Sequence, residues 1–367
     1  MPLALASEIK PLDIPYARFY ADGDPAVFRA LAYEMVSKAH AYRAAQGIKQ
    51  VPPTHFLAIS GGGDDGAYGA GLLVGWTARG DRPQFAVVTG ISTGALSAPF
   101  AFLGSDYDEQ LKRVYPETSA GDIFNTEPLL AILSSDSAVD TAPLKRLIAS
   151  YVDQEMVRRI AEEYDKGRLL LIATTNLDQA RSIIWNIGAI AKSTDPRARE
   201  LIIEVLRASA SIPGAFPPVM LDVTVDGKRY EEMHVDGGAM AQVFLYPPSL
   251  KLKTVDRMRP HHKDIAYIIR NGRLFRAEAS VKRQTLAIAG QAISTMTAAN
   301  AVNDLYRIYL TAQRDGVDFN LAYLEDEFTE PYKGPFDRIY MNTLFEYGYR
   351  KGKAGYAWRK LPPGYQR

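Results

Sequence analysis

Residues 56–94 have the sequence FLAISGGGDDGAYGAGLLVGWTARGDRPQFAVVTGISTG, and this stretch decides the fold of the chain. The short apolar runs His55–Ser60 and Phe85–Gly90 predict two strands, and the small apolar residues Ala67–Trp76 between them predict a helix. A strand, helix and strand of this length form a unit with a right-handed crossover and parallel strands. Both loops that follow the strands therefore leave the same carboxyl edge of one sheet.

A serine follows the second strand of this unit. Gly90-Ile91-Ser92-Thr93-Gly94 has the pattern G-x-S-x-G, and the helical run Ala95–Leu103 comes directly after it. Glycines on both sides of a serine allow the strained turn that exposes its hydroxyl at the top of a sheet. The pattern predicts Ser92 as a nucleophile for acyl transfer, with Gly90 and Gly94 supporting the turn. The alternative is a glycine-flanked turn whose serine only caps the helix.

The glycine loop Gly61-Gly62-Gly63-Asp64-Asp65-Gly66 fits two kinds of site. It matches the G-x-G-x-x-G pattern of dinucleotide-binding folds, which also need an acidic residue on the ribose about 20 residues later. Asp81 is near that count, but it precedes the second strand. Neighbouring strands lie about 4.8 Å apart, so the amides of Gly61, Gly62 and Gly63 can face the serine. We therefore predict an oxyanion hole at this loop and keep a nucleotide site as the weaker alternative.

A nucleophilic serine needs a base, and the strongest candidate is Asp236. The run Tyr230–Asp236 predicts a strand that ends in a carboxylate, and Gly237 and Gly238 follow it and let another backbone pass close. A carboxylate shielded from water has a raised pKa and can accept the serine proton directly. An aspartate–glycine hairpin turn is the alternative explanation of this pattern.

The chain has five histidines. His40 falls in an N-terminal amphipathic segment and His55 opens a strand at the edge opposite the serine, so we expect both to be structural. His261 and His262 follow the serine and the aspartate in the chain order of α/β-hydrolases, which keeps a Ser-Asp-His esterase as an alternative.

Together these motifs resemble those of the patatin-like phospholipase family. The match rests on the glycine loop, the Gly90–Gly94 turn, the Asp236-Gly237-Gly238 triplet and the segment Ala208–Pro217, which has the sequence ASASIPGAFP. The resemblance covers residues 52–273. Four motifs in the right order are far more specific than any one of them.

The resemblance and the strand pattern together imply a three-layer α/β/α fold with a mostly parallel central sheet. The resemblance further implies a lipid acyl hydrolase of the phospholipase A or esterase type, which acts on a lipid or another acyl ester and needs no metal ion or cofactor. By this carry-over Ser92 is the nucleophile and Asp236 the base of a dyad without histidine. The amides of Gly62 and Gly63 then donate to the oxyanion.

One position departs from the family pattern. Patatin-like proteins usually carry arginine or lysine just before the last glycine of the loop, where this chain has Asp65. An anion beside an oxyanion hole opposes the charge of the transition state, at a cost on the order of 1 kcal/mol if it is partly exposed. We expect Asp64 or Asp65 to cap the following helix and to point away from the substrate. This departure keeps open an alternative, which is a catalytically impaired protein that binds a lipid or a partner.

The composition excludes several classes of protein. The 367 residues carry 43 basic and 42 acidic side chains, a net charge of +1, so nothing attracts the chain as a whole to nucleic acid. Cysteine is absent, which excludes disulfides and thiolate metal sites. No apolar run is long enough to predict a membrane-spanning helix.

Residues 1–50 are expected to form an N-terminal extension with one helix. Asp24-Pro25 supplies its cap and first turn, and Gly47 ends it. Its apolar stripe consists of Val27, Leu31 and Met35. No basic region precedes Leu3–Ala6, so we do not expect the N-terminus as written to be a signal peptide. We expect a soluble, cytoplasmic chain, with an exported, periplasmic chain whose signal has been removed as the alternative.

The chain between the serine and the aspartate predicts several short elements. The helices expected there are Asp108–Tyr115, Glu127–Leu133, Thr141–Glu163 and Pro196–Ala210. The continuous apolar run Arg168–Thr174 predicts a buried strand, and Ser182–Ala191 is its expected partner.

Residues 51–275 are the expected catalytic domain, and residues 276–367 are an expected helical region packed on it. Apolar residues at helical spacing predict buried helices there, namely Leu286, Ile288, Ile293, Met296, Ala299 and Val302. The tail Phe345–Trp358 mixes aromatic and basic side chains. A C-terminal helix docked on the core explains this mixture, and peripheral contact with a membrane is the alternative. The sequence sets no oligomeric state.

Overall fold

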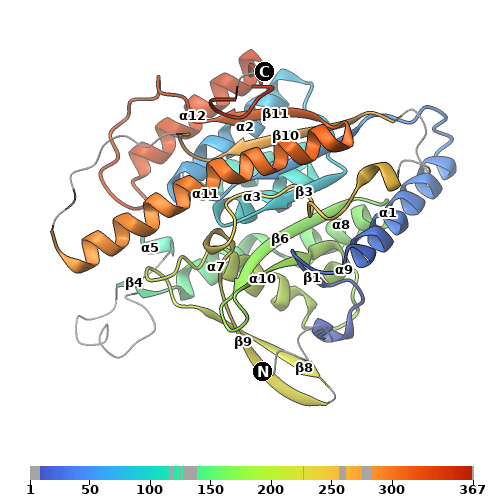
Figure 1. Ribbon diagram of the computed structural model, residues 1–367, viewed down its shortest axis with the longest axis horizontal. Coiled ribbons are helices and arrows are strands. Elements are labelled where there is room, and N and C mark those ends of the chain that lie inside the picture. The colour runs from blue at the N-terminus through green and yellow to red at the C-terminus, as the bar shows by residue number, and fades with distance from the viewer. Residues whose placement is uncertain are drawn as a thin grey trace.

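The computed structural model describes residues 9–115, 120–123, 125–126, 139–225, 227–255, 262–274, 281 and 283–365. These residues form a central sheet with helices on both of its faces (Figure 1). This is the mixed α/β architecture that the sequence predicts. None of the helices in the described ranges has the length and hydropathy needed to cross a bilayer.

The central sheet has 9 strands. Their order along the sheet is β1-β7-β6-β3-β2-β10-β11, and β9 pairs with both β6 and β8. The bounds are β1 (Arg18–Tyr20), β2 (Thr54–Ile59), β3 (Val87–Gly90), β6 (Leu169–Asn176), β7 (Arg181–Asn186), β8 (Val219–Val225), β9 (Lys228–Asp236), β10 (Asp264–Arg270) and β11 (Asp318–Tyr323). A separate sheet of 2 strands consists of β4 (Asn125–Thr126) and β5 (Val139–Asp140).

The middle of the central sheet is parallel. The neighbours β6, β3, β2, β10 and β11 all pair in parallel. Such strands are covered on both faces, which is why every residue of β6 is buried. The remaining pairs, β6 with β7 and β9, β1 with β7, and β8 with β9, are antiparallel. The predicted parallel core is therefore confirmed, and antiparallel strands extend it on the β6 side.

Strands β3 and β9 lie along the same edge of β6. Gly90 of β3 is opposite Ile172 of β6, and Asp236 of β9 is opposite Thr174. Strand β7 pairs with both of these β6 residues from the other edge. Strands β3 and β9 therefore run toward each other end to end. Their last residues lie two positions apart on β6, which is about 7 Å along a strand.

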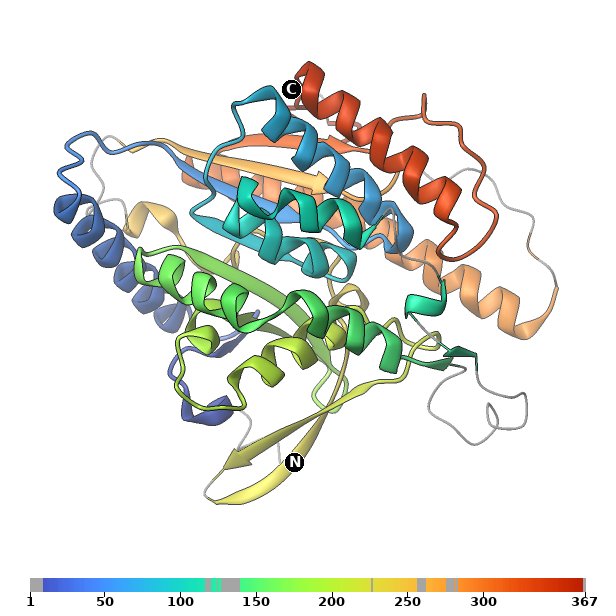
Figure 2. The same ribbon diagram turned by 180° about the vertical axis from the view of Figure 1, so that it is seen from behind.

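Helices cover both faces of the sheet. Their bounds are α1 (Pro25–Ala45), α2 (Gly66–Arg79), α3 (Thr93–Leu103), α4 (Asp108–Val114), α5 (Ala120–Ile123), α7 (Ala142–Tyr151), α8 (Gln154–Asp165), α9 (Ile187–Ala191), α10 (Ala198–Ser209), α11 (Thr285–Asp315) and α12 (Arg338–Ala354). Figure 1 shows α1 and α11 in front of the sheet, and Figure 2, seen from behind, shows α2, α3, α8 and α12 on the opposite face.

Helix α1 begins where the sequence predicts. The Asp24 side chain accepts a hydrogen bond from the amide of Ala26 at 2.8 Å, which caps the helix. Leu31 and Met35 are buried against the sheet, whereas Val27 is 40% exposed. The apolar stripe is therefore confirmed in its second and third positions and wrong in its first.

The segments between the serine and the aspartate are mostly as expected. Helices α4 and α10 form, and the expected helix over 141–163 is two helices, because Asp153 caps the start of α8 through the amide of Met156 at 2.7 Å. The partner of β6 is antiparallel and is a strand only to Asn186, whose side chain caps α9. The predicted helix Glu127–Leu133 lies outside the described residues.

The region after residue 275 differs from the prediction in two ways. It is not wholly helical, because β11 pairs in parallel with β10 and extends the central sheet. In addition, Ile288, Ile293 and Met296 of α11 are 53%, 51% and 65% exposed, although their spacing predicts burial. Helical periodicity identifies the apolar side of a helix but not whether anything covers it. Helix α12 packs on α2, so the docked C-terminal helix is confirmed.

Candidate active site

Ser92 lies in a sharp turn between β3 and α3. Its backbone φ is 56°, in the left-handed region that side-chain-bearing residues seldom adopt. A Cβ atom on Gly94 would lie 2.3 Å from the backbone oxygen of Ile59, and one on Gly90 would lie 2.5 Å from the backbone oxygen of Gly94. Only glycine fits at these two positions, so the turn can pack directly against the end of β2.

The Ser92 side chain makes a hydrogen bond to the carboxylate of Asp236 and makes no bond that caps α3. The alternative of a purely capping serine is therefore wrong. Both side chains are almost closed off from solvent, with 7% of Ser92 and 4% of Asp236 exposed. The sheet brings Ser92 and Asp236 together, because β3 and β9 end close together on the same edge of β6.

Hydrogen bonds with nearby backbone groups hold Asp236 in place. Its amide donates to the backbone oxygen of Ser211 at 2.8 Å, and its Oδ1 accepts from the amide of Gly238 at 2.6 Å. The short helix η5 (Gly237–Ala239) follows β9, and no antiparallel strand turns back from Asp236. The hairpin alternative for this aspartate is therefore wrong among the strands that the structure describes.

Burial changes the acidity of Asp236. It raises the pKa of the carboxyl from 3.8 to about 7, and the hydrogen bonds from Ser92 and Gly238 oppose that rise. A base whose pKa is close to neutral can take a proton from a hydroxyl during attack and return it to a leaving group.

The glycine loop lies beside Ser92, and Gly63 lines the same cavity as the serine. The amide of Gly61 donates to the backbone oxygen of Gln242 at 3.0 Å, so the prediction that Gly61 donates to an oxyanion is wrong. The amides of Gly62 and Gly63 have no hydrogen-bond acceptor among the described residues. These two groups stand at the start of η3 (Gly63–Asp65), which leads directly into α2.

The two loop carboxylates bind the C-terminal part of the chain. Asp64 accepts hydrogen bonds from the amide of Phe336 at 2.7 Å and from the hydroxyl of Tyr332, and Asp65 accepts from the hydroxyl of Tyr340 at 2.6 Å. Burial raises the pKa of Asp64 to about 6. The side chain of Asp65 makes no capping bond to α2. The expected capping role is wrong, because donors from the α12 end of the chain engage both carboxylates.

Two residues at the end of β10, which the sequence motifs do not predict, hold the glycine loop. The Arg270 side chain donates from Nη1 to the backbone oxygen of Gly61 at 2.8 Å, and the Asn271 side chain donates to the backbone oxygen of Ser60 at 2.8 Å. Both residues are buried. The buried cation Arg270 thus contacts the loop from β10, whereas the family pattern has a basic residue within the loop itself. The available signal was a polar pair directly after an apolar strand.

Gln242 links the glycine loop to the aspartate loop. Its backbone oxygen accepts from Gly61, and its side chain donates to the backbone oxygen of Gly238 at 2.7 Å. The backbone amide of Gln242 in turn donates to the carboxylate of Asp304 in α11 at 2.6 Å. Burial raises the pKa of the Asp304 carboxyl. No local pattern marks Gln242, because its role depends on two loops that are far apart in sequence.

The segment Ala208–Pro217 ties the serine and the aspartate to β6. The Ser209 hydroxyl accepts from the amide of Ser92 at 3.0 Å and donates to the backbone oxygen of Ala173 at 2.7 Å. The next serine, Ser211, supplies the backbone oxygen that binds Asp236. The end of α10 therefore positions both candidate residues.

The histidine alternative does not fit this geometry. His262 contacts Thr54 and Asp264, which are the first residues of β2 and β10 and lie at the edge opposite Ser92. The Ser-Asp-His alternative is therefore wrong for His262, and His261 lies outside the described residues. His234 is fully buried beside Thr174, with 2.9 Å between its Nδ1 and the threonine Oγ1.

The nucleotide alternative does not fit either. It requires an acidic residue near the glycine loop, and Asp81 was the candidate. Helix α2 has 14 residues and separates the loop from Asp81, a distance of about 20 Å along the helix. Asp81 instead forms an ion pair with Arg79 at 3.5 Å.

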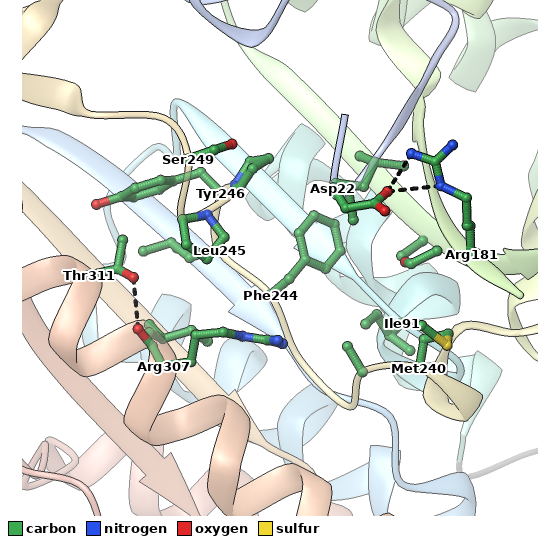
Figure 3. A pocket seen from close by; sticks show the side chains of 18 of the residues that line it. Asp22, Ile91, Arg181, Met240, Phe244, Leu245, Tyr246, Ser249, Arg307 and Thr311 are labelled. Atoms are coloured by element: carbon green, nitrogen blue, oxygen red, sulfur yellow. Dashed lines mark hydrogen bonds and ion pairs between the residues drawn. The ribbon is translucent and has the colours of Figure 1, made fainter. Parts of the chain in front are cut away.

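Two cavities lie on opposite sides of Ser92 and Asp236. The one that borders Ser92 is lined mainly by apolar side chains, including Leu96, Ile123, Leu144, Phe216 and Met341. A larger cavity of about 400 Å³ lies on the α1 and α11 face and reaches Ile91 but not Ser92 (Figure 3). Figure 3 shows Arg181 paired with Asp22 at its rim. We take the smaller cavity as the one relevant to chemistry, because only its wall includes the serine.

Comparison with known proteins agrees with the motifs. The sequence model described as Patatin-like phospholipase matches residues 57–247, which is more than half of the chain and includes the serine turn, the glycine loop and Asp236. No curated protein matches this chain. Among solved structures, VipD from Legionella pneumophila is similar with a TM-score of 0.40 and 12% identity, over 83% of this chain and 67% of that one.

Proposed function

This chain belongs to the patatin-like phospholipase family, and from that premise we propose that it hydrolyses the acyl ester bond of a lipid through a Ser92–Asp236 dyad. One observation carries the proposal. The hydroxyl of a serine held at a strained φ of 56° is hydrogen-bonded to a buried carboxylate whose pKa is raised to about 7. Strain and a perturbed pKa at the same spot are typical of a catalytic site.

In the first step, the Ser92 oxygen attacks the carbonyl carbon of the ester, and the hydroxyl proton passes to Asp236. The carbonyl oxygen becomes negative and lies within reach of the amides of Gly62 and Gly63. The proton on Asp236 then moves to the oxygen of the leaving alcohol as the ester bond breaks. The acyl group remains on Ser92 as an ester.

In the second step, water attacks the acyl-enzyme. Asp236, again ionised, accepts a proton from the water and later returns it to the Ser92 oxygen, which releases the fatty acid. Two free amides beside the reacting carbonyl supply the electrostatic stabilisation, and losing one such donor typically costs about 10²- to 10³-fold in kcat. The cavity beside Ser92 has a volume of about 60 Å³ and mainly apolar walls, which suit the part of an acyl chain next to the ester.

The test is covalent labelling with a fluorophosphonate, which reacts with serines that are activated and lie beside an oxyanion hole. We expect modification at Ser92 in the native chain, located by mass spectrometry of the modified peptide, and a collapse of labelling in Asp236→Asn. The matched control is Asp222→Asn, which removes an exposed carboxylate paired with Arg229 and is expected to label normally. A folded protein that resists the probe, or equal labelling of both variants, would refute the dyad.

A further inference from the structure

The N-terminal half of α11 is an exposed apolar helix. Ile288, Ile293 and Met296 are each more than half exposed, and Ala292 and Ala299 are exposed beside them. At 100° per residue these five side chains fall within one arc of about 140°. We refer to Ile288, Ala292, Ile293, Met296 and Ala299 as the α11 face.

No charged side chain interrupts this part of the helix. From Gln284 to Asn303 the sequence has no Asp, Glu, Lys, Arg or His, although charged residues make up 23% of the chain. A helix surface that faces water usually carries charges on its outer side. The first charged residue that follows is Asp304, which is buried against Gln242.

The α11 face lies on the active-site side of the molecule. Helix α11 leads into β11, which is parallel to β10, so the C-terminal end of the helix lies at the amino edge of the sheet. The N-terminal half therefore extends past Asp304 and beyond the carboxyl edge, where Ser92 lies. From Asp304 to Thr285 this extension is about 28 Å long. Figures 1 and 2 both show this half of the helix projecting from the body of the protein.

Other exposed apolar side chains surround the same edge. Ile212 follows the serine that binds Asp236, Met240 follows η5, and Ile339 lies next to Tyr340, which binds Asp65. They are 38%, 46% and 60% exposed. These residues come from three segments that are far apart in sequence. We call Ile212, Met240 and Ile339 the apolar rim.

We propose that the α11 face and the apolar rim dock the protein onto the surface of a lipid aggregate, with the candidate active site facing the lipid. The inference rests on the proposed function, because the substrate would then be part of the docking surface. An exposed helix surface that carries several apolar side chains and no charge suits a helix that lies in a lipid–water interface. We choose a lipid surface as the partner because exposed apolar side chains from four separate segments lie at the sheet edge of Ser92, and because the proposed substrate is itself a lipid.

The experiment measures binding to phosphatidylcholine vesicles by sedimentation, in a Ser92→Ala background so that the vesicles are not consumed. We compare that protein with the same protein carrying Ile288→Gln, Ile293→Gln and Met296→Gln. Removing three apolar side chains from the interface is expected to weaken partitioning roughly tenfold or more. The matched control is Leu310→Gln, which removes a 57% exposed leucine from the other half of α11 and is expected to bind normally.

Two further results separate the explanations. Binding is expected to persist in high salt, because the α11 face carries no charge; unchanged vesicle binding by the triple variant, or binding that salt abolishes, would overturn the proposal. A native dimer that the triple variant converts to monomers, measured by light scattering, would instead assign the face to a second copy of this chain. Hydrolysis of a dissolved short-chain ester tests the proposed function separately, since it needs Ser92 but no lipid surface.

Discussion

At the scale of single residues, the burial of Asp236 affects both the proposed chemistry and the stability of the folded protein. The strands that bring it to Ser92 also remove it from water, and the loss of hydration is the main cause of its raised pKa. Two hydrogen bonds compensate for only part of that loss. In the proposed mechanism the same burial makes the carboxylate a suitable base, but burial also opposes ionisation of the carboxyl group in the folded protein. Activity and stability should therefore respond to pH in opposite directions.

The activity should rise with pH through neutrality. Asp236 accepts a proton only when it is ionised, so kcat/KM for a dissolved ester is expected to increase with a midpoint near the pKa of about 7 and to level off above it. The measurement is the pH profile of kcat/KM and of the fluorophosphonate labelling rate. A midpoint near 4, typical of an unshifted carboxylate, would contradict the assignment of Asp236 as the base.

The stability should change in the reverse sense. The folded-state pKa of Asp236 lies above the unfolded value of 3.8, so its contribution to the free energy of unfolding is fully present below about pH 4 and is lost as pH rises through about 7. Asp236→Asn cannot ionise. It is therefore expected to be more stable than the native chain at pH 8, by on the order of 1 to 4 kcal/mol, and the difference should vanish near pH 4. Urea unfolding of both proteins at the two pH values measures this, and a native chain that is the more stable at pH 8 would refute it.

The loop aspartate should matter little for the chemistry. The Asp65 carboxylate is hydrogen-bonded to the Tyr340 hydroxyl and does not line the cavity beside Ser92. We expect Asp65→Asn to change kcat/KM by less than about tenfold, since a partly screened charge at this position contributes on the order of 1 kcal/mol. An increase of a hundredfold or more would show that the carboxylate acts directly on the oxyanion. The matched variant is Tyr340→Phe, which removes the hydroxyl that donates to Asp65 and keeps the aromatic ring.

At the scale of elements, the contact between α2 and α12 depends on glycine. The two helices run in the same direction with their backbones in contact, and Gly71 and Gly75 of α2 alternate with Gly348 and Gly352 of α12. A Cβ atom on Gly348 would lie 2.3 Å from the backbone oxygen of Tyr68. Such contact holds the two helices, and with them the glycine loop at the start of α2.

A single methyl group should test this contact. Gly348→Ala is expected to lower the free energy of unfolding by about 1 to 3 kcal/mol, because the helices must move apart to admit it. Gly290→Ala is the matched control, since nothing lies within 4 Å of the added atom in α11 and alanine favours a helix by about 0.5 to 1 kcal/mol. Chemical denaturation measures both changes, and equal effects would contradict the argument.

The sequence predicted the elements that carry local signals and missed the contacts between distant ones. The serine turn, the glycine loop and the strand before Asp236 each have a short-range pattern, and all three are observed. Their convergence depends on β3 and β9 sharing one edge of β6, and pairing across 60 residues or more leaves no local mark. For the same reason Arg270, Asn271 and Gln242 were missed. The burial of Ile288, Ile293 and Met296 in α11 was predicted wrongly, because helical periodicity is the same whether protein or water covers the apolar side.

At the scale of the whole molecule, the chain after residue 275 completes the sheet and holds the candidate site. Strand β11 extends the central sheet, and α12 covers α2. Asp304 of α11 holds Gln242, while Tyr340 and the amide of Phe336 bind the carboxylates of the glycine loop. The candidate site therefore depends on residues from both sides of the expected boundary at residue 275.

This arrangement predicts that residues 1–275 do not fold on their own. Without the later part of the chain, β10 becomes an edge strand and the apolar face of α2 meets water, which removes a large part of the buried core. We expect the fragment to lack cooperative thermal unfolding and to resist fluorophosphonate labelling at Ser92. Co-expression with a second fragment, residues 276–367, should restore both properties, because the missing contacts are not covalent. A fragment that folds and labels alone would mean that the glycine loop keeps its geometry without α11 and α12, and that these helices serve only the docking surface.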